Sequence, residues 1–304
     1  MPNSSREYKK EHKTESALEH IHPAVLLVYY AAMIGGTFLC AHPVYAAISL
    51  FCALVQAFCL GGRRAVPVAL GLGLPLFVGT AVLNPLLVHQ GSTILFYIRY
   101  NPVTLEACVY GLVFAGTLWA GVLWFFCCGR LMTSDKFLYL LGRPLPTMAL
   151  MASMIFRLIP RLRGQMAAIA EGQRGMGRGN NTGGLLQKTR NGLRVLSIAV
   201  TWALEDAVIT ADSMKARGYG THRRSHFSLF RITAADALFL GVVAILAAVA
   251  LWGGFTHGQY LFYPVREAVR FDALAVIQYG AFLLLGLCPV AAVLKENVYW
   301  KSFV

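Results

Sequence analysis

Residues 111–128 read GLVFAGTLWAGVLWFFCC, an uninterrupted run without a charged side chain. An α-helix rises about 1.5 Å per residue, so roughly 20 apolar residues cross the hydrocarbon core of a bilayer. The rest of the chain has the same character, with 57% hydrophobic and 13% charged residues. An ordinary soluble domain carries about a quarter charged residues. The sequence therefore predicts an integral membrane protein.

Five more apolar segments predict the other spans, which makes about six transmembrane helices in an all-α fold. The first two segments adjoin at Ala41-His42-Pro43, where the proline favours two helices over one long helix. The six predicted spans are residues 24–40, 42–60, 65–88, about 104–128, about 233–253 and 272–294. 

The Lys and Arg residues are distributed unevenly between the two sides of these spans. An even number of spans places both termini on one side, and 24 of the 27 Lys and Arg residues fall there. The positive-inside rule makes that side the cytoplasm, so we expect a multi-pass protein of the cell membrane with both termini cytoplasmic. Topology explains much of the net charge of +13. Membrane lipid is an expected partner and nucleic acid is not.

The chain divides around one long basic segment. The predicted parts are a cytoplasmic tail (1–23), the first four spans (24–128), a cytoplasmic segment (129–231), and the last two spans with a short tail (232–304). The external connection, residues 84–103, is apolar and lies between two Asn-Pro pairs. This pattern is typical of an interfacial loop, re-entrant or strand-like.

The cytoplasmic segment is too long for a simple connection and carries two amphipathic helical patterns. The first pattern follows Pro146, should kink at Pro160, and ends in the glycine-rich residues 171–184. Its apolar stripe consists of Met148, Met151, Ile155, Leu158, Leu162, Met166 and Ile169. The stripe of the second pattern consists of Leu193, Leu196, Val200, Ala203, Ala207, Ala211 and Met214.

The second pattern runs into Ala216-Arg217-Gly218, followed by Tyr219 and Gly220. Gly218 or Gly220 is the expected left-handed cap of this helix. The helix dipole favours a cation such as Arg217 at this end. 

Catalytic motifs are missing from the chain. The sequence has no P-loop, no Gly-x-Ser-x-Gly and no His-Glu-x-x-His, and its seven cysteines lack metal-ligand spacing. We therefore expect no enzyme activity, no cofactor and no metal site. The spans hold few ionisable residues, and Glu106, Asp236 and Asp272 lie near span ends, which argues against a self-sufficient ion-driven carrier.

Three features of the chain are shared with a known family: the six predicted spans, the basic segment before the fifth span, and the stretch Ala211-Asp-Ser-Met-Lys-Ala-Arg-Gly-Tyr-Gly220. In these features the chain resembles the transmembrane T component of energy-coupling factor (ECF) transporters. The resemblance implies two coupling helices, each ending in an Ala-Arg-Gly-like motif that docks on an ABC-type ATPase. It also implies one or two ATPase subunits that hydrolyse ATP, and a membrane-embedded subunit that binds a vitamin or a metal ion.

The resemblance assigns ATPase coupling to Ala216, Arg217 and Gly218. At the first helix end, Gly175-Met176-Gly177 stands where Ala-Arg-Gly is expected, between Arg174 and Arg178. The residues assigned to coupling there are Arg174, Gly175, Gly177 and Arg178. The alternative function is a stand-alone secondary carrier, channel or membrane-bound enzyme.

Overall fold

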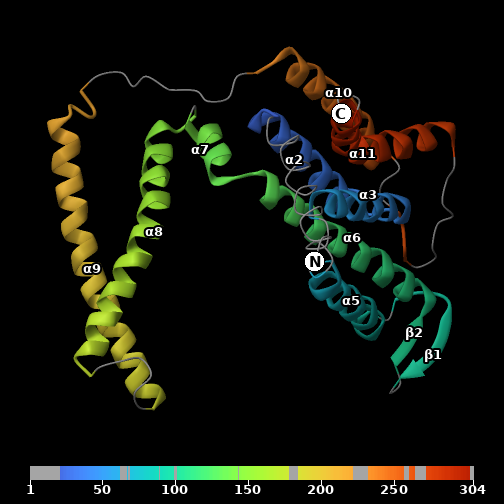
Figure 1. Ribbon diagram of the computed structural model, residues 1–304. Coiled ribbons are helices and arrows are strands. Elements are labelled where there is room, and N and C mark those ends of the chain that lie inside the picture. Colours follow the sequence, from blue (N-terminus) through green and yellow to red (C-terminus); the bar gives the residue numbers. More distant parts are fainter. Residues whose placement is uncertain are drawn as a thin grey trace. The chain divides into compact units, whose positions relative to one another are not determined.

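The computed structural model is mostly helical and forms two compact units (Figure 1). Unit 1 combines Met1–Lys136 with Phe230–Val304, and unit 2 is Phe137–Leu229. The structure describes residues 21–61, 67, 69–88, 90–98, 101–142, 144–177, 184–221, 232–256, 260–263 and 272–301. 

The apolar segments predicted from the sequence are helical in unit 1. Its helices are α2 (Pro23–Leu39), α3 (Pro43–Gly61), the π-helix η2 (Ala69–Gly73), α5 (Leu74–Leu87), α6 (Leu105–Leu131), α10 (Ala234–Thr256) and α11 (Ala273–Lys301). Helix α7 (Ser134–Gly142) contains the boundary between the units, and unit 2 consists mainly of α8 (Pro146–Gly175) and α9 (Leu185–Ala216).

Four helices in the described part of the chain are long and apolar enough to cross a membrane. They contain Pro43–Leu60, Leu105–Leu131, Ala234–Thr256 and Ala273–Ala291. Two further apolar helices, Pro23–Leu39 and Gly71–Leu87, are shorter. The chain is thus a membrane protein by the length and composition of four of its helices.

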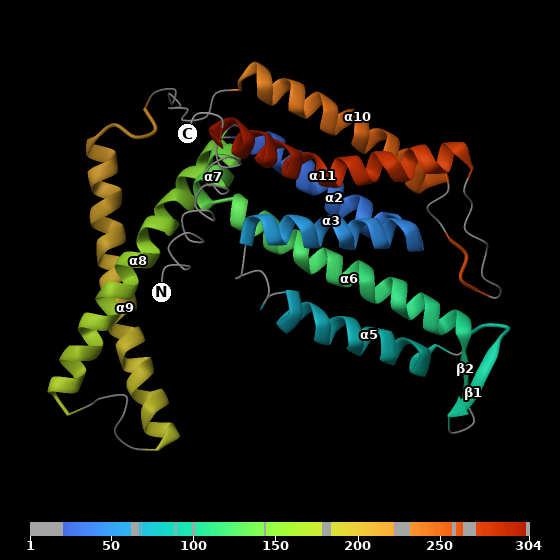
Figure 2. The same ribbon diagram turned by 45° about the vertical axis from the view of Figure 1, so that its right-hand side comes forward.

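Helix α6 occupies a central place in unit 1 because α2, α3 and α5 all pack against it (Figure 2). Helix α11 packs on α3 and α10, and α10 returns to pack on α2. The order α2, α6, α3, α11, α10 therefore closes on itself, with α5 on the outer side of α6.

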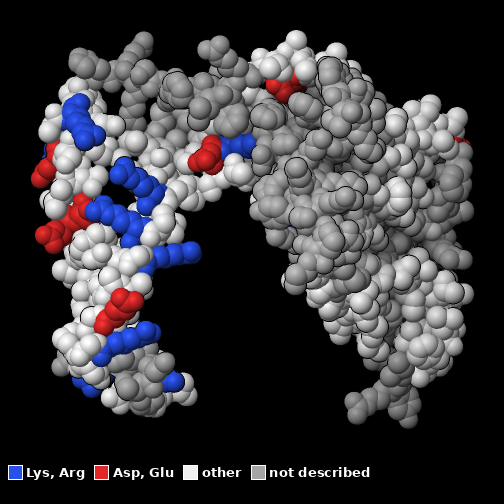
Figure 3. Space-filling model, viewed as in Figure 1, with Lys and Arg blue, Asp and Glu red and all other residues white. Residues whose placement is uncertain are grey.

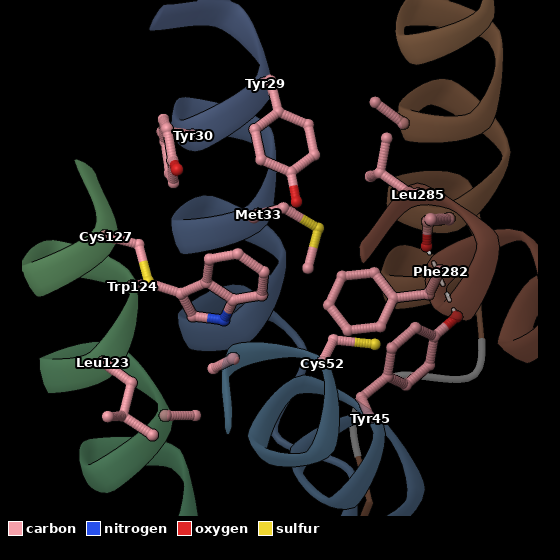
Figure 4. Close-up of a cluster of buried hydrophobic side chains, with 14 of the residues drawn as sticks. Tyr29, Tyr30, Met33, Tyr45, Cys52, Leu123, Trp124, Cys127, Phe282 and Leu285 are labelled. Atoms are coloured by element: carbon pink, nitrogen blue, oxygen red, sulfur yellow. Dashed lines mark hydrogen bonds between the residues drawn. The ribbon is translucent and has the colours of Figure 1, made fainter. Parts of the chain in front are cut away.

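Aromatic side chains fill the centre of this bundle (Figure 4). Trp124 of α6 is fully buried and donates its indole N–H to Ser49 Oγ of α3 at 3.0 Å. Ser49 Oγ also lies 2.6 Å from Thr37 Oγ1 of α2. The Trp124 indole and the Ser49 and Thr37 hydroxyls therefore each have a partner on another helix, as required where water is absent.

Close backbone approach between α3 and α11 depends on Gly286. A Cβ atom at this position would lie 2.7 Å from the Cβ atom of Cys52 on α3. Real side chains do not tolerate that distance, so the absence of a side chain lets the two helices meet.

A β-hairpin precedes α6 and is an exception to the all-helical prediction. Strand β1 (Ile94–Ile98) pairs antiparallel with β2 (Asn101–Thr104), within the segment for which the sequence indicated a re-entrant or strand-like loop. Glu106, in the first turn of α6, accepts hydrogen bonds from Ser92 Oγ at 3.2 Å and from the backbone N–H of Thr93 at 3.2 Å. This buried carboxylate ties the approach to the hairpin to α6.

Asp236 has a comparable structural part at the start of α10. The backbone N–H of Thr233 donates to Asp236 Oδ2 at 3.1 Å, and the backbone N–H of Asp236 donates to Thr233 Oγ1 at 3.2 Å. These reciprocal bonds form a capping box, which satisfies two amide donors of the first helical turn. Two of the three acidic residues near span ends, Glu106 and Asp236, thus hold local structure, whereas Asp272 is exposed.

Candidate functional site

Helices α8 and α9 run antiparallel and form the helical hairpin of unit 2 (Figures 1 and 2). The sequence predicted both, and α8 continues as one helix through Pro160, which cannot donate a backbone hydrogen bond to residue 156. At about 1.5 Å per residue, the 32 residues of α9 extend about 48 Å. Because the helices are antiparallel, their C-terminal ends lie at opposite ends of the hairpin.

Polar contacts fasten the two helices to each other. Arg161 of α8 forms an ion pair with Asp206 of α9, with 2.8 Å between Nη1 and Oδ2. The Arg161 guanidinium also lies 5.1 Å from the ring centroid of Trp202, within the range of a cation–π interaction. Arg157 and Arg161 stand four residues apart in the sequence of α8, but the sequence does not identify their partners on α9.

The buried stripe of α9 differs from its predicted apolar stripe. Asn191, Val195 and Ala199, spaced by four residues, are the buried residues of this helix. Leu193 and Leu196 of the predicted stripe are 66% and 46% exposed. The contact with α8 therefore leaves most of the apolar stripe of α9 uncovered.

Helix α8 also presents apolar side chains to its surroundings. Met148 and Met151 of its predicted stripe are more than half exposed. Other strongly exposed apolar residues of the hairpin include Ile155, Leu185, Leu186, Leu193, Leu204, Val208 and Ile209. Exposed apolar surface of this extent is typical of a protein or membrane contact. In Figure 3 the basic side chains also gather mainly over α8 and α9, so the hairpin is both apolar and cationic.

Helix α9 ends at Ala216 in a glycine-closed turn. The amide of Gly218 donates to the carbonyl of Lys215 at 2.9 Å, and the amide of Tyr219 donates to the carbonyl of Met214 at 3.1 Å. Gly218 has φ +73° and forms the left-handed cap, for which the sequence predicted Gly218 or Gly220. These are the two hydrogen bonds of a Schellman motif.

Arg217 occupies the residue between the last helical position and this glycine. Its backbone has φ −83° and ψ 2°, and its side chain is exposed. Among the described residues no carboxylate forms an ion pair with its guanidinium. Arg217 is thus available for an acidic partner at the tip of the hairpin.

Helix α8 ends in the same backbone geometry. Met176 has φ −86° and ψ 14°, Gly177 has φ +74°, and the amide of Gly177 donates to the carbonyl of Arg174 at 3.0 Å. Through Gly177, the turn therefore matches the end of α9 residue for residue. Gly175 corresponds to Ala216, Met176 to Arg217 and Gly177 to Gly218, as in the alignment made from sequence.

The correspondence separates the two arginines considered at the first end. Arg174 takes the position of Lys215, not of Arg217, because it lies three residues before the left-handed glycine. Arg178 lies outside the described residues. The side chain in the position equivalent to Arg217 belongs to Met176, which is 60% exposed.

A groove of about 500 Å³ opens between the two helices near the end of α9. Arg157 and Arg161 line it from α8, and Asp206, Arg217 and Tyr219 line it from α9 and the turn after it. Its apolar lining is made by Met154, Leu158, Ala203, Ala207, Ile209, Ala211 and Met214. The sequence contained these residues in two separate patterns and could not join them into one groove.

No cluster of three or more metal-ligating side chains occurs among the described residues. Comparison of the chain with models of known protein families and with curated proteins finds no match. Any function proposed for the chain therefore rests on its own residues at the ends of α8 and α9.

Proposed function

We propose that the chain is the transmembrane scaffold and coupling subunit of an ECF-type ABC importer. In this role α8 and α9 are coupling helices that receive the ATP-driven movement of separate ATPase subunits. The chain passes that movement to a membrane-embedded subunit that binds a vitamin or metal ion. The membrane part comprises six spans, with the shorter helices α2 and α5 as the first and third, and both termini are cytoplasmic.

The proposed role rests chiefly on the turn after α9. A Schellman motif closes the helix, so the backbone around Arg217 is fixed by two hydrogen bonds. Arginine offers a planar, permanently charged group that binds carboxylates in a bidentate manner. A fixed helix end with an exposed arginine, which forms no ion pair with the carboxylates that the structure describes, suits docking into an acidic groove of a soluble partner.

The distance between the two helix ends supports a partner with two separate docking positions. Antiparallel helices of about 45 Å place the ends of α8 and α9 far apart. Each of two ATPase subunits can therefore engage one end. A hairpin braced at Arg161, Asp206 and Trp202 can carry movement between those ends without bending at its crossing.

The exposed apolar face of the hairpin supports a contact with another membrane subunit or with lipid. Residues such as Leu204 and Val208 are 64% and 62% exposed, which is costly in water. Methionines such as Met148 and Met151 adapt to a surface that changes shape, because the thioether chain is flexible and polarisable. A scaffold that must remain in contact with a moving partner needs such a surface.

Two of the three acidic residues near the span ends count against an ion-driven carrier. Glu106 and Asp236 are buried and accept hydrogen bonds from neighbouring backbone amides. A proton or cation relay needs carboxylates that face a pathway through the spans. These two groups instead hold the starts of α6 and α10.

The test is purification of the full-length chain from its own membranes in mild detergent, with the ATPase activity of the preparation measured. Arg217→Glu should reduce the retained ATPase subunits by about tenfold or more, because it places like charges in contact. Arg217→Lys keeps the charge but loses the planar fork, so it should retain an intermediate amount.

A matched control is Arg194→Glu, which makes the same charge change on α9 away from the turn. It should leave ATPase retention within about twofold of the wild-type value. Normal retention of the ATPase subunits and normal substrate uptake in the Arg217→Glu variant would contradict the coupling role. Transport by the purified chain alone in liposomes would favour the stand-alone carrier or channel.

A further inference from the structure

The two glycine-closed ends present different side chains on the same backbone. Met176 has φ −86° and ψ 14°, close to φ −83° and ψ 2° at Arg217, and each is followed by a left-handed glycine, Gly177 or Gly218. A side chain at either position leaves the helix end in the same direction relative to the last turn. The chemistry of that side chain therefore decides what each end can dock into.

We propose that the end of α8 docks through Met176 into an apolar pocket of its partner subunit, whereas the end of α9 docks through Arg217 into an acidic one. This inference rests on the proposed coupling function and specifies its partner surfaces. The two docking positions are then not interchangeable, even though the helix ends have the same shape.

Exposure and charge around the two tips support the distinction. Met176 is 60% exposed between two glycines, Gly175 and Gly177, so no neighbouring side chain shields its thioether from a partner. Burying such a side chain in an apolar pocket stabilises a complex because it removes apolar surface from water. Arg217 instead lines the basic groove between α8 and α9, together with Arg157 and Arg161.

The two contacts differ in how they depend on salt. Raising the salt concentration from about 0.1 M to about 1 M shortens the screening length from about 10 Å to about 3 Å. An exposed contact made by Arg217 weakens under that change, whereas the burial of a thioether does not. Salt therefore separates the two ends in a single preparation.

The experiment monitors each end by its own cross-link in the full-length complex. A photo-crosslinking phenylalanine analogue is placed at Glu171, which is exposed one turn before the end of α8, or at Tyr219, which is exposed beside Arg217. The yield of cross-linked ATPase subunit is measured at about 0.1 M and about 1 M NaCl. The variants Met176→Glu, Met176→Leu and Arg217→Glu are compared at both positions.

We expect Met176→Glu to lower the cross-link yield from position 171 by about tenfold or more and to leave the yield from position 219 unchanged. Arg217→Glu should lower the yield from position 219 and leave the yield from position 171 unchanged. Met176→Leu should retain the cross-link because leucine has similar volume and polarity. High salt should abolish only the cross-link from position 219. The double variant Arg174→Ala, Arg178→Ala tests the flanking charges and should leave the cross-link from position 171 intact.

Two sets of results overturn the inference while leaving the coupling function in place. In the first, the cross-link from position 171 survives Met176→Glu, or disappears in high salt. In the second, loss of Arg174 and Arg178 abolishes that cross-link. Absence of any ATPase cross-link from either position in the wild-type chain contradicts the coupling function itself, and with it the inference.

Discussion

The turn after α9 should be sensitive to a single methyl group at Gly218. This residue has φ +73°, a conformation that costs an L-amino acid with a Cβ atom about 1 to 2 kcal/mol. Added steric strain is small, because the new Cβ would lie 3.3 Å from Thr221 Oγ1, at the end of a short side chain. Gly218→Ala should therefore destabilise the closed turn by about 1 to 2 kcal/mol through its backbone alone.

Hydrogen exchange of the full-length protein in detergent measures this effect. The amides of Gly218 and Tyr219 are protected by their bonds to the carbonyls of Lys215 and Met214. A loss of 1 to 2 kcal/mol corresponds to exchange that is faster by about 5- to 30-fold in the peptide that contains them. Gly218→Asn should lose less exchange protection than Gly218→Ala, since asparagine tolerates the left-handed conformation.

Gly192 provides the matched control on the same helix. It lies within α9, and a Cβ atom there would meet no atom within 4 Å. Gly192→Ala should stabilise the helix by about 0.5 to 1 kcal/mol and slow exchange locally. Unchanged exchange at residues 218–219 in Gly218→Ala would refute the reasoning. An equal loss of exchange protection in the Gly218→Ala and Gly192→Ala variants would refute it as well.

Two further predictions concern the packing of unit 1, and thermal unfolding in detergent, followed by a dye that labels newly exposed cysteines, measures both. Gly286→Ala should lower stability by about 1 to 3 kcal/mol because its Cβ would overlap the side chain of Cys52. The control Gly280→Ala should be neutral or stabilising, because the new atom has open space around it. Equal effects of the two variants would contradict the close approach of α3 and α11. Trp124→Phe should lower the free energy of unfolding by about 1 kcal/mol or more, because it leaves Ser49 without the indole donor. In a Ser49→Ala background the same change should cost less. Additive losses of stability in the double variant would mean that the hydrogen bond contributes nothing.

Helix positions and the membrane class followed from the sequence because they depend on local chemistry. Apolar runs such as residues 111–128 predict a membrane helix from transfer energies alone, and the structure places α6 there. The left-handed cap at Gly218 was also predicted, since glycine after a helical pattern is the usual way to end a helix. The external loop was left open between a re-entrant and a strand-like form because strand pairing depends on a partner segment.

Properties of pairs of segments required the tertiary structure. The predicted apolar stripe of α9 would suggest that Leu193 and Leu196 pack on α8, yet Asn191, Val195 and Ala199 are buried instead. Periodicity identifies an apolar face but does not say whether a neighbouring helix, lipid or another protein covers it. Only the crossing of the two helices decides that.

By itself the sequence determined a basic, helical membrane protein with an amphipathic helical pattern that runs into Ala216-Arg217-Gly218, because composition and periodicity act within a single segment. The tertiary structure decided that the ends of α8 and α9 share one backbone geometry and that Met176 stands in the position of Arg217. It also decided that these ends lie at opposite ends of the hairpin. These facts depend on dihedral angles and on the packing of distant residues, which the linear order of side chains does not specify.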